Sequence, residues 1–191
     1  MNRYRNQSTS RTAPTDALNQ KLREIVRLAE AGQLEAALEK CTSSDIPAME
    51  LRNARAVCLM RLGRSEEALT LYRGFVLHPG CTWLKSDLPA YIAANFATTI
   101  LLCGRPLGCE AVLSEIADQE HPSVRRLRTV LQQWRSSLPF VARLKRLLGL
   151  EPDVPVPLDF SPGEFIDPMT RPSTTVDSMT SSPPPSATQN A

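Results

Sequence analysis

The amino-acid sequence predicts an all-α protein, built as a short solenoid of about three helical hairpins with capping helices at its C-terminal end. Three observations predict this fold. A short segment recurs along the chain, apolar residues follow a helical period on both sides of each recurring glycine, and a basic amphipathic stretch follows the last recurrence. Internal repetition at intervals of about 20–50 residues is typical of stacked units that bury their apolar faces against one another.

The recurring segment is recognised by a glycine and, five positions later, a small residue. Two copies align glycine on glycine and alanine on alanine at a spacing of 31 residues, and a third, weaker copy has cysteine in the alanine slot. The aligned pairs are Gly32 and Ala37, Gly63 and Ala68, and Gly104 and Cys109.

The second copy has the chemistry of two helices joined by a tight turn. Apolar residues in 53–62 recur at three- and four-residue spacing, which predicts a first helix. Gly63 suits a helix end that needs a positive φ, and Ser65 is a candidate cap for the next helix. Residues 68–76 supply a second apolar face, and Pro79 closes the unit.

This second copy resembles the tetratricopeptide repeat (TPR). Leu62-Gly63 matches the turn, Ala68 the small residue, Tyr72 the aromatic residue and Pro79 the closing proline, one place early. The resemblance extends over residues 17–122 and implies a right-handed arrangement of three hairpins.

The outer copies depart from the family pattern. The first has Ala31 in place of the turn leucine and Cys41 in the aromatic slot, and the third ends at Pro122. The longer spacing between the second and third copies fits a loop at residues 79–87, with Ser86 or Asp87 as a possible cap for the following helix.

The resemblance also implies a concave groove lined by the first helix of each unit. Leu22 and Val26 occupy slots that carry Lys and Asn in relatives that clamp a partner's C-terminal carboxylate, so that kind of recognition is not expected here. Apolar walls with a few amides would suit an extended or helical peptide, although Leu22, Val26 and Val57 could equally be core residues. The candidate partner-binding residues are Leu22, Val26, Asn53, Val57, Arg61, Tyr91, Asn95 and Thr98.

Composition divides the chain into four parts. We expect a disordered N-terminal arm at 1–15, a TPR-like helical domain at 16–149, an extended proline-rich segment at 150–166 and a disordered tail at 167–191. The arm has no apolar run, so no signal peptide is expected, and no apolar stretch is long enough to span a membrane.

The net charge of the chain is only +2, but basic and acidic residues are concentrated in different parts of it. Residues 121–150 contain seven basic residues and no carboxylate, whereas the chain beyond them is acidic. The basic residues could simply solvate the outer face of the capping helices, or they could form a patch that contacts a membrane or nucleic acid. We favour packing of 140–148 on the core over membrane contact, and no aromatic residues interleave the basic run as a nucleic-acid platform requires. The patch comprises Arg125, Arg126, Arg128, Arg135, Arg143, Lys145 and Arg146.

Catalytic constellations are not evident, so we expect no enzyme activity, no metal and no cofactor. His78 and His121 each precede a proline that closes a unit, which gives both a structural reason. The five cysteines form no Cys-x-x-Cys pair, and their odd number favours a reducing cytoplasm. We expect Cys81 to lie in the loop and the other cysteines to lie on apolar helix faces or at a helix turn.

Residues 151–166 carry one further signal. Val154, Val156, Leu158 and Phe160 alternate with proline and aspartate, which is the two-fold pattern of an extended segment with one apolar side. Because basic helices precede this acidic segment, we hypothesise that it folds back along the helical domain, with plain disorder as the alternative.

Together these features predict a cytoplasmic, non-enzymatic adaptor or scaffold that binds a protein partner on its concave surface. The alternatives are a peripheral membrane or nucleic-acid contact through the basic C-terminal helices, and a regulatory subunit of an enzyme complex. A groove binder should tolerate moderate salt, whereas binding to phosphates or lipid headgroups should weaken steeply with salt.

Overall fold

A computed structural model describes residues 12–44 and 46–170, with side chains from residue 16 onward. The described residues are all-helical, as the sequence predicts, and their remaining β-type pairing is one isolated bridge between Leu77 and Leu84. The helices are α1 (Thr12–Glu30), α2 (Leu34–Thr42), α3 (Met49–Arg61), α4 (Ser65–Val76), α5 (Ala90–Leu102), α6 (Pro106–Glu115), α7 (Pro122–Ser137) and α8 (Phe140–Leu147).

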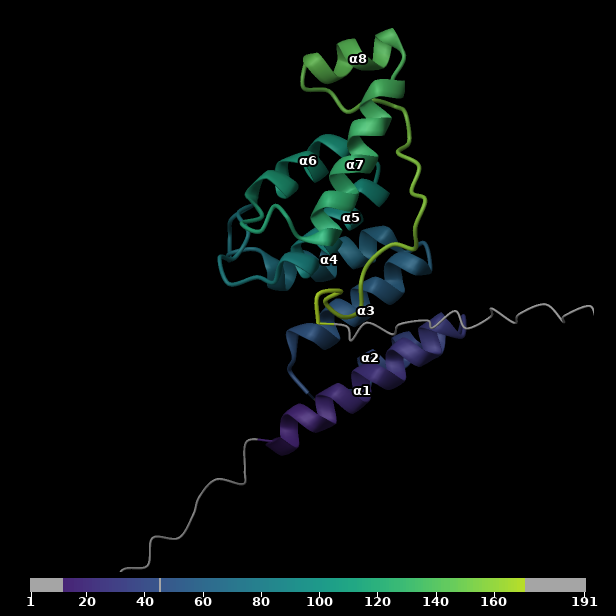
Figure 1. The fold of residues 1–191 in the computed structure, drawn as a ribbon, viewed down its shortest axis with the longest axis vertical. Helices are drawn as coiled ribbons and strands as arrows, with labels where there is room; N and C mark the ends of the chain where they lie inside the picture. The colour runs from purple at the N-terminus through teal and green to yellow at the C-terminus, as the bar shows by residue number, and fades with distance from the viewer. Residues whose placement is uncertain (1–11, 45, 171–191) are drawn as a thin grey trace, which may run out of the picture.

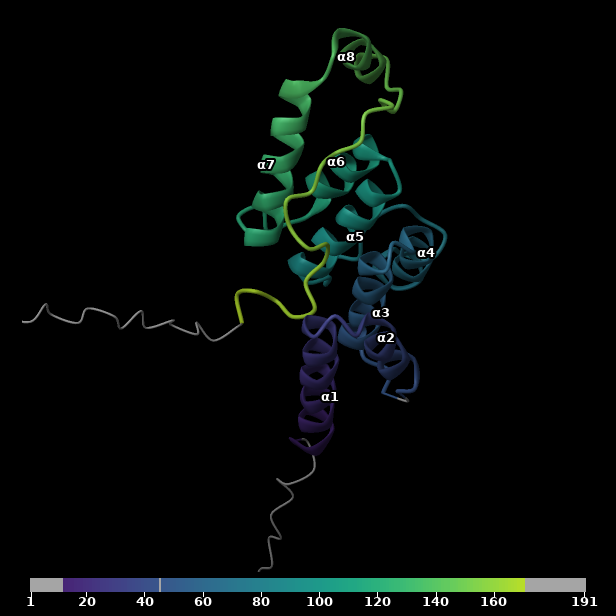
Figure 2. The ribbon, with the colours of Figure 1, turned by 90° about the vertical axis from the view of Figure 1, so that its right-hand side faces the viewer.

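The helices pack in chain order, as Figures 1 and 2 show. Helices α1 and α2, α3 and α4, and α5 and α6 pack as antiparallel neighbours, and α2 contacts α3 as α4 contacts α5. Helices α1, α3, α5 and α7 also contact one another in succession. After α8 the chain turns back, and residues 150–166 pass α7 and α5 to reach α3.

The recurring glycines end their helices in the left-handed conformation that the sequence predicts. Gly32, Gly63 and Gly104 have φ values of 75°, 75° and 73°. At Gly63 the glycine N–H donates to the Met60 carbonyl, and the next N–H, from Arg64, donates to the Leu59 carbonyl. The same pair of hydrogen bonds follows α1 and α5, so one C-terminal motif closes the first helix of each hairpin.

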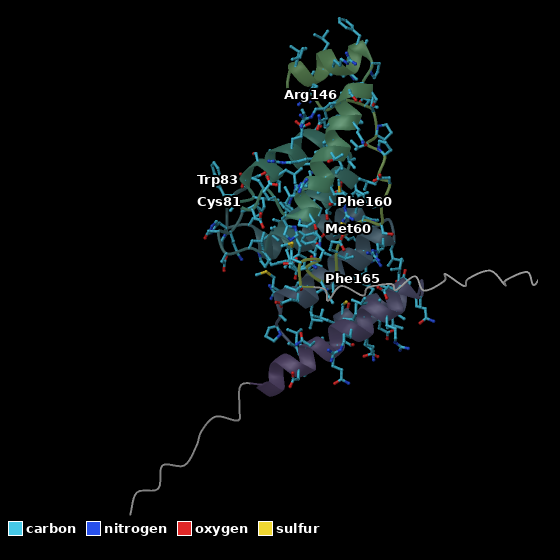
Figure 3. All side chains as sticks on the ribbon, in the orientation of Figure 1. Met60, Cys81, Trp83, Arg146, Phe160 and Phe165 are labelled. Carbon is cyan, nitrogen blue, oxygen red and sulfur yellow. The ribbon has the colours of Figure 1, made fainter. Side chains whose placement is uncertain are left out.

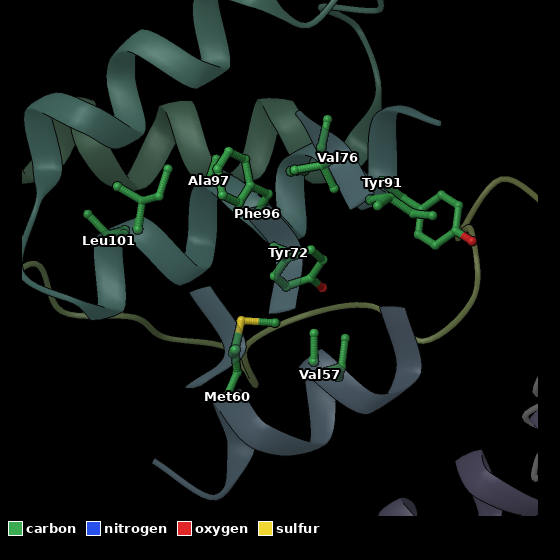
Figure 4. Packing of buried hydrophobic residues seen from close by; sticks show 14 of the residues in the cluster. Val57, Met60, Tyr72, Val76, Tyr91, Phe96, Ala97 and Leu101 are labelled. Carbon is green, nitrogen blue, oxygen red and sulfur yellow. The ribbon is translucent and has the colours of Figure 1, made fainter. Parts of the chain in front are cut away.

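The small-residue slot lies in the core. Ala37, Ala68 and Cys109 are all fully buried, which agrees with the alignment of the three copies. Around them the core is built from side chains of successive helices, and Tyr72 packs against Phe75 and Phe96 with ring centroids 5.4 Å and 6.0 Å apart (Figure 4).

Several sequence-based boundaries are wrong. Helix α1 begins at Thr12, so residues 12–15 are helical rather than part of an arm. Ser65 is the first residue of α4 rather than its cap, and α5 begins at Ala90 after Pro89, beyond both expected caps. The boundary at Pro122 agrees with the sequence, because α7 begins there and proline at the first position of a helix loses no hydrogen bond.

The expected packing of 140–148 on the core is also wrong. Leu144 and Leu148 are exposed, Phe140 and Leu147 are exposed to 79% and 80%, and the buried residue of α8 is Ala142. Pro139 lies in an extended conformation between α7 and α8 and turns the last helix away from the body, at the top of Figure 1. None of the helices in the described residues is long and apolar enough to cross a membrane.

Candidate functional site

The most distinctive site is the surface of α3 and α5 that holds the C-terminal segment, defined here as residues 150–170. The segment has no helix or strand of its own and lies along the helices (Figures 1 and 2). Val154, Val156, Leu158 and Phe160, the alternating apolar residues of the sequence, are half-buried against the core. The indole N–H of Trp134 donates to the Val154 carbonyl over 3.2 Å. The apolar edge of the segment therefore faces the helical body.

Two asparagines, Asn53 on α3 and Asn95 on α5, bind the backbone of Glu164 from both sides. Their Nδ2 atoms donate to the Glu164 carbonyl over 2.9 Å and 2.8 Å, and the Glu164 N–H donates to Asn95 Oδ1 over 2.8 Å. Asn53 Oδ1 accepts from the Tyr72 hydroxyl and from Asn95 Nδ2. Burial raises the pKa of Tyr72 well above its ordinary value, so the hydroxyl stays a donor. Because both amides are buried, the segment supplies hydrogen bonds that water does not reach.

Arg61, at the end of α3, binds the two preceding carbonyls. Its Nε donates to the Pro162 carbonyl over 3.1 Å and its Nη2 to the Gly163 carbonyl over 2.9 Å. The guanidinium carbon also lies 4.6 Å from the centre of the Phe165 ring, in cation–π geometry. Burial lowers the pKa of Arg61, and the Glu164 carboxylate opposes that shift. Three consecutive carbonyls of the segment are thus held by side chains of the α3–α5 surface.

Gly163 is pressed against α3 in a conformation that suits glycine alone. Its φ is +78°, and a Cβ there would lie 2.6 Å from Met60 Cε and 2.9 Å from Val57 Cγ2. Both side chains come from α3 and point toward α4 and α5 in Figure 4. Any other residue would therefore combine backbone strain with a steric clash.

Charged and aromatic side chains hold the rim of the site. Arg126 on α7 pairs with the Glu164 carboxylate, and its guanidinium lies 4.2 Å from the centre of the Phe160 ring. His121, the residue before α7, has its Nε2 3.2 Å from the Asp167 carboxylate and accepts the Ser123 N–H on Nδ1. Figure 3 shows Phe160 and Phe165 along the path of the segment.

The predicted groove residues divide into two groups. Asn53, Arg61 and Asn95 bind the segment directly, and Val57 packs against Gly163. Burial is the main cause that raises the pKa of Tyr91 to about 12, and the negative charges of Glu50 and Asp167 contribute to this shift. The effect of Asp167 indicates that Tyr91 lies close to the segment.

The contacts of the remaining predicted residues lie within the helical body. The Thr98 hydroxyl donates to the Ala94 carbonyl within α5. Leu22 is buried in the core and Val26 packs partly against it, which matches the alternative that they are core residues.

Residues of this site that the sequence analysis missed are Met60, His121, Arg126, Gly163 and Phe165. From the sequence, Arg126 is placed in the basic patch near the acidic segment without Glu164 being identified as its partner, and His121 is assigned to a structural turn. The usable signal was the Pro162-Gly163 pair, because glycine after proline marks a special backbone conformation within an otherwise acidic and apolar run.

The candidate basic patch is largely engaged within the molecule. Glu110 on α6 pairs with Arg135 and Arg146 over 2.9 Å each, and Asp153 pairs with Lys145. Arg143 donates to the carbonyls of Leu138 and Ser136. The rest of the set divides between Arg126 at the segment, Arg125 within 4.0 Å of Glu120, and the exposed Arg128.

Within the described ranges, no group of three or more His, Cys, Asp or Glu side chains could hold a metal ion. Comparison of the chain with family models, curated proteins and solved structures finds no match.

Proposed function

We propose that this protein is a non-enzymatic adaptor of the TPR type that binds an extended segment of a protein partner on its α3–α5 surface. The observation that carries this proposal is the set of side chains that binds the backbone of residues 162–164, namely Asn53, Arg61 and Asn95. Backbone groups are common to every peptide, so such a set is suited to peptide recognition.

The repeated architecture supports the same proposal. The recurrence of the glycine turn after α1, α3 and α5 and the burial of the three small residues fit a solenoid of three hairpins. In such an array the first helices of the hairpins share one surface, and α1, α3 and α5 contact in succession here. The five cysteines are all unpaired, which supports a reducing compartment such as the cytoplasm.

Affinity purification from the native source tests the proposal. The bait is the full chain as wild type, as Arg61→Ala and as Arg64→Ala. Arg64 is a matched control because it lies on the same hairpin, is exposed and pairs with Glu67. We expect a partner that is retained by wild type and Arg64→Ala at moderate salt and is lost with Arg61→Ala. A partner that binds all three proteins equally would contradict the α3–α5 surface as the binding site.

A second candidate function is contact of α8 with a membrane surface, favoured by the exposure of Phe140, Val141, Leu144 and Leu147 on one short helix. The cations of α8 are already paired or bound to carbonyls, so the contact would rest on apolar burial. Co-sedimentation of the full chain with anionic vesicles, compared with a Phe140→Ser/Leu147→Ser variant, tests it. Sedimentation that the variant loses would support this function, and no sedimentation would exclude it.

A further inference from the structure

We infer that the C-terminal segment is an internal copy of the motif that the partner presents. The α3–α5 surface then selects extended peptides with glycine followed by an acidic and an aromatic residue, and residues 162–167 occupy the surface until such a peptide displaces them. This inference rests on the proposed adaptor function and specifies its partner.

The glycine position is the sharpest part of the motif. Gly163 is buried, has a positive φ and leaves no room for a Cβ beside Met60 and Val57. The α3–α5 surface therefore accepts only a residue without a side chain at this position. A partner peptide needs glycine there for the same two reasons, backbone conformation and space.

Two arginines contact the side chains at the next two positions, 164 and 165. The carboxylate of Glu164 pairs with Arg126, which is fixed on α7. The ring of Phe165 is 6% exposed and lies beneath the guanidinium of Arg61. An acidic side chain followed by an aromatic one satisfies both arginines, and a basic residue at the first position would meet Arg126 with like charge.

The way the segment is attached makes it displaceable. It has no hydrogen-bonded secondary structure of its own. It follows the helical body through residues 150–161, whose apolar side chains are half-buried or exposed apart from the buried Pro152. Its release breaks the contacts on the α3–α5 surface without opening any helix, which is the kind of local opening that costs less than global unfolding. The tether keeps the segment at a high effective concentration, so it competes strongly with a free peptide.

Fluorescence anisotropy with a labelled peptide tests the inference. The probe has the sequence of residues 158–168, and the proteins are the full chain as wild type, Gly163→Ala and Gly80→Ala. Gly80 is the matched control because its φ is +74° and a Cβ there meets nothing within 4 Å. We expect Gly163→Ala, whose own segment no longer fits, to bind the probe about tenfold or more tightly than wild type, and Gly80→Ala to match wild type.

A second set of probes tests the motif itself on the Gly163→Ala protein. Replacing the probe's glycine with alanine, its glutamate with lysine or its second phenylalanine with alanine should each weaken binding by about tenfold or more. Phe165→Ala serves as a second variant in which the segment should be released. Thermal melting is the control that each variant is folded. Equal probe affinity in wild type and both released variants would overturn occupation by the segment. Equal affinity for the glycine and alanine probes would overturn the motif.

The test separates this inference from the adaptor function. If the released variants bind no probe while the native partner still depends on Arg61, the motif is overturned and the adaptor function stands. If the probe binds as expected but no native partner depends on Arg61, the motif is supported and the adaptor function is overturned.

Discussion

The methyl group of Ala68 is fully buried in the core, and the same is true of Ala37 in the first hairpin. Such a position has room for one carbon and little more. We predict that Ala68→Leu lowers the free energy of unfolding by about 1–3 kcal/mol through overpacking. Thermal melting measures this, with Ala36→Leu as the control, because Ala36 is exposed on α2. An unchanged melting temperature for Ala68→Leu would mean that the core can expand there without cost.

The five cysteines should differ sharply in reactivity. Cys81 is exposed in the loop before α5, Cys103 is half-buried at the end of α5, and the other three are buried. Burial also raises the pKa of Cys109 to about 12 and of Cys103 to about 11, which disfavours the reactive thiolate. We predict that a thiol reagent labels Cys81 first and that Cys81→Ser removes the fast phase. Fast labelling of several thiols in Cys81→Ser would contradict this order.

At the level of residues, the sequence predicted site residues correctly where the alignment of the repeated copies alone determines which helix carries them. Asn53 and Asn95 are 42 residues apart, and the alignment of the hairpins places them on neighbouring helices, where they share a hydrogen bond. The same register predicts Thr98 for that surface, and its hydroxyl binds the carbonyl one turn back, within α5. The Pro162-Gly163 pair marks a special backbone conformation in the sequence, but the contact of Gly163 with Met60 and Val57 could not be predicted, because only the tertiary fold brings those side chains to it.

At the level of elements, the glycine turns were predictable and the helix starts were not. A C-terminal turn with positive φ needs a particular residue, and Gly63 supplies it. A helix start has several alternative solutions, and α4 and α5 begin after Arg64 and Pro89 with no side-chain cap. The extended conformation of Val154 to Phe160 could be predicted from the sequence. Large apolar residues that alternate with proline and aspartate give an extended segment one apolar side, whatever surface it packs against.

Helix α8 shows why apolar content does not establish packing. The apolar residues of 140–148 follow a helical period, but the direction of the chain after Pro139 decides which way they face. They are Phe140, Val141, Leu144, Leu147 and Leu148. We predict that Leu147→Ser changes the free energy of unfolding by no more than about 0.5 kcal/mol, because Leu147 is already exposed. The buried Leu127 of α7 gives the contrast, and Leu127→Ala should cost about 2–5 kcal/mol. Chemical denaturation measures both. A large loss with Leu147→Ser would mean that α8 is buried in solution, for example between two copies of the chain.

The whole molecule should lose stability in strong alkali. Burial raises the pKa of Tyr91 from 10.0 to about 12, and burial also raises that of Tyr72. Between pH 10 and 12 the folded state therefore holds protons that the unfolded state has released, and stability falls as the pH rises. We predict a decline in melting temperature across this window. Tyr91→Phe should make the decline shallower, because phenylalanine does not titrate, and an identical slope would contradict the assignment to Tyr91.

The segregation of charge along the chain corresponds to ion pairs between the C-terminal segment and the basic helices. The acidic residues after α8 meet basic helices, with Asp153 at Lys145 and Glu164 at Arg126. The sequence predicted the sign of these contacts but not their partners, since seven basic residues in 121–150 were equally available. Of the expected disordered tail, residues 167–170 form a turn in which Asp167 accepts the Met169 N–H, and 171–191 lie outside the described residues, as do 1–11 of the N-terminal arm.

The bond between Asn53 and Glu164 joins residues 111 positions apart, whereas the helices mostly contact their neighbours in sequence. Local contacts form quickly during folding, and closing a long loop costs chain entropy that only a preformed surface can repay. The helices should therefore assemble first and the C-terminal segment should dock in a later kinetic phase. A newly folded molecule would pass through a brief interval with its α3–α5 surface empty. Under the proposed adaptor function, a partner would meet no internal competitor in that interval.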